Sequence, residues 1–303
     1  MKCFKLMLFV SVLFLLKGCI KDKIDSCENK LILEFEHRGK LGTDILLDAI
    51  NKVDVFIFDE SNELVYKRQI DRKSLSTSRE VLIEVNPGKY RIICWANAND
   101  NSVFEKNELG SNLTDLHLNN NTLNNHNIIN GDPLYYYSTD IDISSPEIIG
   151  ETLKKIIPFC KAHIKVEVFI KGFEDASKDK PDLTPIVELT NLSTDYNFNK
   201  RTTKDNITAI NKTTYTTING DTTAIIDFYT ATFTEDTNAE LLIRKQSDNS
   251  IITTVSLKDF IKKNNIDLQT CFQPIVPISI EYKGTEVAIS LPTWETVQVK
   301  PDL

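Results

Sequence analysis

The sequence lacks the short motifs that support most enzymatic chemistry. It contains no G-x-S-x-G nucleophile elbow, no H-E-x-x-H metal motif and no P-loop. A C-x-x-C pair is also absent, so a zinc site has little support. The histidines are dispersed and lack the spacing of helical metal ligands: His37, His117, His126 and His163. These absences predict a protein that is not an enzyme and holds no metal or small-molecule cofactor.

Basic clusters with interleaved aromatic side chains are missing as well. Lys and Arg number 35 against 43 Asp and Glu, which gives a formal net charge of −8. The first 18 residues carry lysines and no acidic residue, so their removal leaves a more negative chain. Such a surface repels a phosphate backbone. Nucleic acid is therefore not an expected partner.

The apolar run near the N-terminus is too short to span a bilayer, which needs roughly 20 apolar residues. It extends from Leu6 to Leu16 and follows a short basic start with Lys2 and Lys5. This pattern is typical of a secretory signal peptide. We therefore expect residues 1–18 to be removed rather than folded.

A cysteine stands where this leader ends and charge begins. Leu16, Gly18 and Cys19 resemble the bacterial lipobox, although Lys17 is not the small neutral residue usual there. The resemblance implies that Cys19 carries a covalent lipid, and more than one acyl chain gives stable membrane anchoring. The alternative is an ordinary cleaved signal peptide followed by an incidental cysteine. Residues 19–30 are polar and charged, as expected of a tether between lipid and fold.

Four cysteines remain once Cys3 and Cys19 are set aside. They are widely separated in an exported chain and allow three disulfide pairings: Cys27, Cys94, Cys160 and Cys271. Cys94 lies in an apolar segment, where a small buried thiol is the commoner arrangement. The sequence leaves the pairing open.

Most of the chain after residue 30 consists of short segments with strand character. Residues 161–170 alternate polar and apolar side chains, which indicates a strand buried on one face. Asn86-Pro87-Gly88-Lys89 predicts a hairpin with a type II turn, because Pro presets φ and Gly accepts a positive φ. The remaining predicted strands are 31–36, 53–58, 63–66, 81–85, 90–95, 186–189, 224–231, 240–243, 275–282, 285–291 and 296–300.

Helix signals are few. Ser256 can cap a helix over residues 257–263, whose Leu257, Phe260 and Ile261 form an apolar stripe. Residues 96–132 are Asn-rich and predict a long excursion with limited helix or irregular structure. Many short strands with turn signals predict an all-β protein of two β-sandwich domains, residues 31–155 and 156–303.

Three segments resemble the FimB-type fimbrillin-associated anchor lipoproteins of Bacteroidetes type V pili. They are residues 53–59 (VDVFIFD), 85–90 (VNPGKY) and 94–97 (CWAN), and the lipobox-like Cys19 precedes them in the expected order. The resemblance covers most of the mature chain. It implies two transthyretin-like, Ig-like Greek-key sandwiches and a lipid-anchored, surface-exposed place on the outer membrane. It also implies fimbrial shaft subunits as partners.

In that family subunits join by donor-strand exchange, in which one chain's terminal strand completes a neighbour's sheet. The resemblance implies that an anchor keeps its own N-terminal strand, so that fibre growth stops there. It also makes the C-terminal segment a candidate donor or docking strand, through Val287, Ile289, Leu291, Val297 and Val299. Pro292 divides this segment, and an ordinary domain-closing strand pair is equally compatible with it.

Other functions depend on weaker signals. A glycan- or ligand-binding surface lipoprotein would need exposed aromatics, for which Trp294 and Tyr135–Tyr137 are the candidates. Residues 97–108 offer oxygen ligands but lack the initial Asp and central Gly of a calcium loop. Asp140 and Asp142 should share an outward strand face without an identifiable partner. A hydrolase is disfavoured by the missing catalytic groups.

Overall fold

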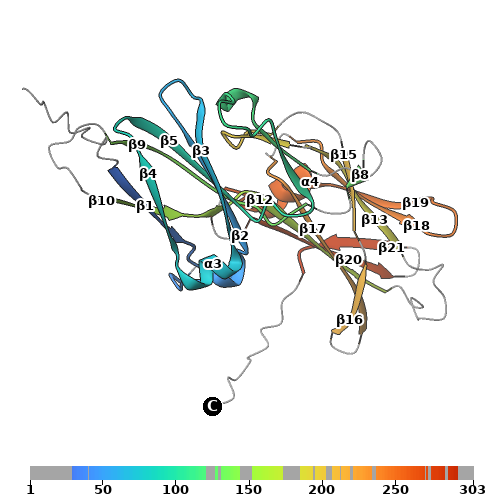
Figure 1. Ribbon diagram of the computed structural model, residues 1–303. Helices are drawn as coiled ribbons and strands as arrows, with labels where there is room; N and C mark the ends of the chain where they lie inside the picture. The colour runs from blue at the N-terminus through green and yellow to red at the C-terminus, as the bar shows by residue number, and fades with distance from the viewer. Residues whose placement is uncertain are drawn as a thin grey trace, which may run out of the picture.

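The computed structural model describes the chain from residue 29 to residue 292, with gaps (Figure 1). The described residues are 29–39, 41–120, 127–128, 131–143, 152–172, 185–193, 195–202, 207–211, 213–218, 221–233, 237–269, 271, 274–283 and 286–292. Their secondary structure consists of β-strands in five sheets, with three short α-helices and one 3₁₀ turn. The all-β prediction is confirmed.

The N-terminal sandwich lies at the left in Figure 1 and has two layers. The first layer, the β1 sheet, has the order β10 (Thr152–Pro158), β1 (Asn29–Glu36) and β4 (Glu80–Val85). The second layer, the β5 sheet, has the order β11 (Cys160–Lys161), β9 (Tyr135–Asp142), β5 (Lys89–Ala96), β2 (Lys52–Phe58) and β3 (Leu64–Asp71). Leu31, Leu33 and Phe35 of β1 pack against Val55 and Ile92 of the β5 sheet in one core.

The C-terminal sandwich is built in the same way. Its β12 sheet has the order β16 (Thr214–Ile218), β17 (Asp221–Ala231), β12 (His163–Lys171), β20 (Ile275–Lys283) and β21 (Glu286–Ser290). Its β13 sheet has the order β19 (Ile251–Ser256), β18 (Glu240–Lys245), β13 (Pro185–Leu192), β15 (Ile207–Ile210) and β8 (Asn127–Ile128). Val166 and Val168, predicted to face inward, are buried in the core between these sheets.

Helix α4 (Leu257–Asn264) closes one end of this core. The hydroxyl of Ser256 accepts a hydrogen bond from the Asp259 amide at 3.3 Å, and Leu257, Phe260 and Ile261 are buried. The predicted helix and its cap are therefore confirmed. The other helical segments are α2 (Leu46–Ala49), α3 (Arg72–Thr77) and the 3₁₀ turn η1 (Leu113–Asp115).

The hairpin predicted at residues 86–89 is wrong. Strand β4 pairs with β1, whereas β5 pairs with β2 and β9, so this connection crosses between the layers of the sandwich. Gly88 does not adopt the positive φ of a type II turn. The crossing is held by the Ile143 amide, which donates to the Gly88 carbonyl at 2.8 Å, and by the Tyr90 hydroxyl, which donates to the Asn86 carbonyl.

The excursion over residues 96–132 contains more regular structure than predicted. Its strands β6 (Ser102–Glu105) and β7 (His117–Asn120) form a small sheet, the β7 sheet, with β14 (Asp195–Asn197) of the C-terminal half. Tyr196 and Phe198 from that half join Phe56 and Trp95 in a third core on the outer face of the β5 sheet. Strand β2 is therefore buried on both faces, which explains its nearly continuous apolar sequence.

The structure shows the state of three of the four cysteines that the sequence left open. Cys160 and Cys271 form a disulfide with Cα atoms 4.6 Å apart. Cys94 is a free, buried thiol whose pKa is raised by burial, as its apolar strand indicated. Cys27 lies outside the described residues. The division into 31–155 and 156–303 stays a prediction; β10 runs across that position and pairs with β1.

Asn97 joins two connections of the N-terminal sandwich to each other. Its backbone has φ of 60°, and its buried side chain accepts from the Asn51 amide at 2.8 Å. The side-chain amide donates to the carbonyls of Ala49 at 2.8 Å and Pro133 at 3.2 Å. One residue therefore satisfies three backbone groups, two in the connection at residues 49–51 and one at Pro133.

We expect Asn97→Ala to lower the free energy of unfolding by about 3 kcal/mol, since it removes these bonds and places Ala at a left-handed φ. Asn62→Ala is the matched control, because Asn62 also has φ of 60° but lies in the exposed β2–β3 turn. That control should cost about 1 kcal/mol. Equal losses for both variants in urea unfolding would contradict a clamping role for Asn97.

Candidate docking and anchoring site

The chain's own N-terminal strand occupies the centre of the β1 sheet. Strand β1 runs parallel to β10 from Lys30 opposite Thr152 to Glu36 opposite Pro158, and antiparallel to β4 on its other side. Its inward side chains Leu31, Leu33 and Phe35 are almost fully buried. Both edges of β1 are therefore paired within the chain, and its apolar face is covered.

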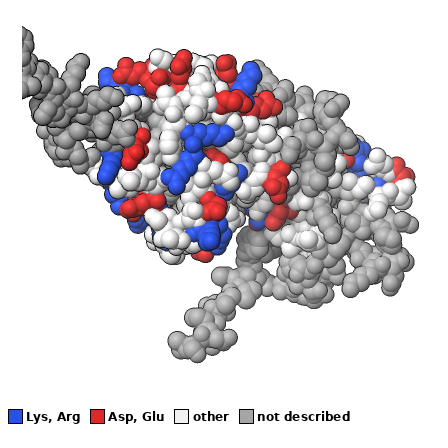
Figure 2. Space-filling model, viewed as in Figure 1, with Lys and Arg blue, Asp and Glu red and all other residues white. Residues whose placement is uncertain are grey.

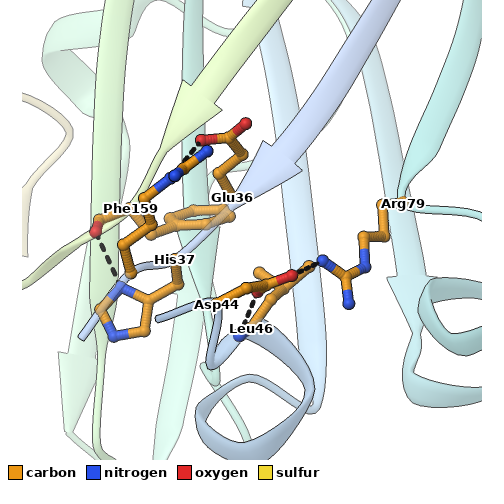
Figure 3. Close-up of polar contacts among 7 residues, drawn as sticks. Glu36, His37, Asp44, Leu46, Arg79 and Phe159 are labelled. Carbon is orange, nitrogen blue, oxygen red and sulfur yellow. Dashed lines mark hydrogen bonds and ion pairs between the residues drawn. The ribbon is translucent and has the colours of Figure 1, made fainter. Parts of the chain in front are cut away.

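The pairing of β1 and β10 continues beyond the ends of the strands. The Phe159 amide donates to the Glu36 carbonyl at 2.9 Å. His37 Nδ1 donates to the Phe159 carbonyl at 3.0 Å (Figure 3). On the outer face, Lys154 Nζ lies 2.9 Å from a carboxylate oxygen of Glu34 and 2.6 Å from one of Glu80. Lys154 thus connects all three strands of the β1 sheet.

The turn that follows β1 is held to β4 in the same region. Asp44 pairs with Arg79 and accepts a hydrogen bond from the Leu46 amide at 3.0 Å, which starts helix α2 (Figure 3). Arg79 directly precedes β4. The exit of β1 is therefore fixed to the strands on both of its sides.

Two buried histidines lie where the halves of the molecule meet. His163 Nδ1 donates to the Leu134 carbonyl at 2.8 Å, and burial lowers the pKa of His163 to about 4. Burial also lowers the pKa of His37. Tyr135 contacts both rings, with centroid distances of 4.8 Å to His37 and 5.8 Å to His163. Both imidazoles are therefore neutral packing groups near pH 7.

The candidate C-terminal docking segment begins in β21. This strand pairs antiparallel with β20, from Ser279 opposite Ser290 to Lys283 opposite Glu286. Val287 and Ile289 pack against the C-terminal core, whereas Ala288 is exposed. Leu291 follows with 38% of its surface exposed. Val297 and Val299 lie outside the described residues, as do Trp294, His126 and Cys19.

Strand β21 is the last strand of its sheet in the part of the chain that the structure describes. One edge is bonded to β20, and the other presents the unpaired backbone groups of an edge strand. Such an edge can accept a strand from another protein. Because Val287 and Ile289 already pack against the core, the edge of β21 is formed before any partner binds.

The other sequence candidates are not brought together into a binding site. Tyr135 is buried, and Tyr136 packs on Trp95 with its hydroxyl donating to the Phe198 carbonyl at 2.9 Å. Asp140 faces outward as predicted and pairs with Arg91, whose Nε lies 2.7 Å from its carboxylate. This pair lines an open pocket of about 400 Å³ at one end of the N-terminal sandwich.

Among the residues that the structure describes, no three His, Cys, Asp or Glu side chains are grouped to hold a metal ion. No helix in the same residues has the length and apolar character needed to cross a membrane. Figure 2 shows acidic and basic side chains interspersed on the visible face of the N-terminal sandwich.

Sequence reasoning missed β10 and with it the pairing that completes the β1 sheet. Residues 152–158 lack clean alternation, because Lys154 and Lys155 are adjacent and Lys155 faces inward, half-buried. The β-branched pair Ile156-Ile157 was the available signal. The disulfide partner of Cys160 could not be chosen from spacing alone.

Acid should weaken the fold through His163. In the unfolded chain its pKa is about 6.5, whereas the buried imidazole stays neutral until about pH 4. The stability that this group contributes is full above pH 6.5 and is lost as the pH falls towards 4, by about 3 kcal/mol in total. His163→Asn keeps a donor for the Leu134 carbonyl and does not titrate.

The difference in unfolding free energy between wild type and His163→Asn should therefore shrink, or reverse in sign, between pH 7.5 and pH 4. Urea unfolding of both proteins over this range measures it. A difference that is constant with pH would show that His163 titrates normally in the folded protein.

Two neighbouring substitutions test which face of β21 packs against the C-terminal core. Ile289→Lys places a charge against the C-terminal core and should lower the free energy of unfolding by about 2 kcal/mol, with faster proteolysis of the C-terminal segment. Ala288→Lys faces solvent opposite Glu281 and should change stability by less than about 0.5 kcal/mol. Equal effects of the two lysines would contradict the observed facing of β21.

Comparisons with known proteins agree with this architecture. At 15% identity and a TM-score of 0.65, the fold is similar to a candidate polysaccharide-binding protein from Bacteroides thetaiotaomicron, with 86% of this chain and 96% of that chain covered. A candidate adhesin from Bacteroides ovatus aligns at 14% identity and a TM-score of 0.67, with coverage of 90% and 97%. At these identities the likeness establishes the fold alone.

The fimbrial anchor protein Mfa2 from Porphyromonas gingivalis has a similar fold, at 14% identity and a TM-score of 0.66, with 87% of this chain and 95% of that chain covered. No curated protein sequence matches the chain. The family model of the fimbrillin-A associated anchor proteins Mfa1 and Mfa2 matches residues 24–300. The chain therefore belongs to the family of fimbrillin-A associated anchor proteins.

Proposed function

We propose that this protein is a lipid-anchored, non-enzymatic subunit that attaches a fimbrial shaft to the outer membrane and ends its growth at the base. Cys19 carries the lipid, and the segment from Val287 onward docks the shaft by β-strand complementation. Family membership supports the fimbrial role. The observation that carries the proposal is the position of β1 in the centre of its own sheet.

A self-completed sheet has no vacancy for a strand from another subunit. To enter between β10 and β4, a foreign strand would have to displace Leu31, Leu33 and Phe35 from the core. Each such side chain contributes about 1.5–3 kcal/mol by burial, and the displaced backbone would lose its hydrogen bonds on both sides. The N-terminal sandwich is therefore closed to strand insertion, and a fibre cannot extend through it.

The N-terminal end is free to serve as the tether because β1 enters its sheet from that side. About ten residues separate Cys19 from Lys30, and an extended chain of that length spans about 35 Å. Two or three acyl chains on Cys19 would hold this end in the bilayer, since each buried methylene contributes about 0.8 kcal/mol. The fold then stands clear of the membrane surface.

Attachment of the shaft is assigned to the other end of the chain. Strand β21 belongs to the C-terminal sandwich, whereas β1 belongs to the N-terminal one. Lipid and shaft would thus act on different sandwiches. The alternative, a glycan-binding role, loses two of its candidate aromatics, because Tyr135 and Tyr136 are engaged in packing.

The experiment replaces Cys19 with Ala in cells that assemble the fimbriae. We expect intact fibres to be shed into the medium and the protein to leave the membrane fraction. Cys27→Ala is the matched control and should leave the fibres attached. A separate variant that ends after Leu291 should stay in the membrane but lose contact with the shaft. Attached fibres in both the Cys19→Ala and truncated strains would overturn the proposal.

A further inference from the structure

We propose that the chain is built as a load-bearing link in which tension between its two ends runs through β1, β10, β20 and β21 and bypasses the rest of both sandwiches. The inference rests on the proposed function, because it takes the membrane to pull on the N-terminal end and the shaft on the C-terminal end. Two features form the path: the parallel pairing of β1 with β10, and the disulfide between Cys160 and Cys271. Together they keep tension off nearly all the chain between residues 37 and 270.

The direction of β1 and β10 decides how their pairing is loaded. The membrane pulls β1 at its N-terminal end, Lys30, and the C-terminal sandwich pulls β10 at its C-terminal end, Pro158. Because the strands are parallel, these two points lie at opposite ends of the pair. The two forces act in opposite directions along the strands, so the pair is sheared. All seven residue pairs from Lys30–Thr152 to Glu36–Pro158 then share the load. Peeling would load them one after another.

Further contacts brace this pair against sliding. Phe159 stacks on Phe35 with ring centroids 6.0 Å apart, and its amide bonds to the Glu36 carbonyl. Its carbonyl accepts from His37, just past the end of β1 (Figure 3). Lys154 binds Glu34 across the pair. The buried face of β1 excludes water from one side of the ladder. While the pair holds, the segment between residues 37 and 151 bears no tension.

The disulfide continues the path two residues after β10 ends. Cys160 is bonded to Cys271, which lies just before β20, and the Lys161 amide donates to the Cys271 carbonyl at 3.2 Å. Tension that enters through β21 and β20 therefore crosses to β10 through a covalent bond. The two cysteines are 111 positions apart in the sequence, so their disulfide closes a long loop. This loop contains β12 and all of the β13 sheet except β8. Pulling on the chain ends cannot extend that loop.

Single-molecule force spectroscopy on the full mature chain, held by handles at its two termini, tests both parts. Under oxidising conditions, rupture of the β1–β10 pair should lengthen the chain by about 400 Å, at about 3.5 Å per released residue. With 1,4-dithiothreitol, or in the Cys160→Ser/Cys271→Ser variant, total extension should increase by about 380 Å more, the length of the loop between the cysteines. Equal total lengths with and without the disulfide would overturn the bypass.

The loading direction needs a second measurement on the same fold. One handle stays at the N-terminus, and the other is attached to a cysteine introduced by Thr152→Cys. Cys19, Cys27 and Cys94 are replaced by Ser so that no other thiol reacts. Because Thr152 lies opposite Lys30, force then peels the pair from one end. At equal pulling speed, the rupture force between the termini should be about two- to threefold higher than in this geometry, because forced unfolding follows the barrier along the pulled direction. Equal rupture forces would overturn the shear arrangement.

These measurements do not depend on the fimbrial role, so the two proposals can fail separately. If the force measurements show shear and bypass but fibres stay attached in both the Cys19→Ala and the truncated strains, the anchor is rejected and the mechanical device loses its proposed load. Shed fibres in Cys19→Ala cells, together with a chain that extends fully when oxidised, would keep the anchor and reject the bypass.

Discussion

The insertion of β1 between β10 and β4 is the interaction on which the rest of the structure depends. It closes the β1 sheet, supplies three of the largest side chains in the N-terminal core, and brings the residues just before the C-terminal sandwich alongside the residues nearest the N-terminus. A strand that starts a domain and pairs with the strand that leaves it makes the domain a closed unit. That closure is the physical basis of the proposal that this chain ends a fibre.

The two sandwiches are also joined by side chains that belong to neither of their central cores. Tyr196 is buried, and its hydroxyl donates to the Ala162 carbonyl and accepts from the Thr232 amide, while its ring packs on Trp95 at 5.4 Å. Strand β14 around it pairs with β7 of the other half. Burial raises the pKa of the Tyr196 hydroxyl, so this group stays a neutral donor at any physiological pH. This junction buries aromatic surface from both halves and so resists their separation.

Local features of the sequence predicted local structure well. The cap and stripe of α4, the alternation in β12 and the apolar setting of Cys94 all depend on neighbours a few residues away. The turn at residues 86–89 was predicted from equally local signals and was wrong, because β4 takes its partner from β1, about 50 residues earlier. Strand β10 was missed for the same reason: its Lys154 is explained only by Glu34 and Glu80, which lie on other strands.

The sequence by itself determined that the chain is all-β, that Ser256 begins a helix, and that residues 53–58 form a strand; the residues responsible are contiguous and act through backbone geometry and local side-chain pattern. Only the tertiary structure decided which strands pair, that β1 is central, and that Cys160 meets Cys271 rather than another cysteine. A strand forms backbone hydrogen bonds with a neighbouring strand at any sequence distance, and its own residues do not specify which strand that is. The function proposed here lies in those pairings.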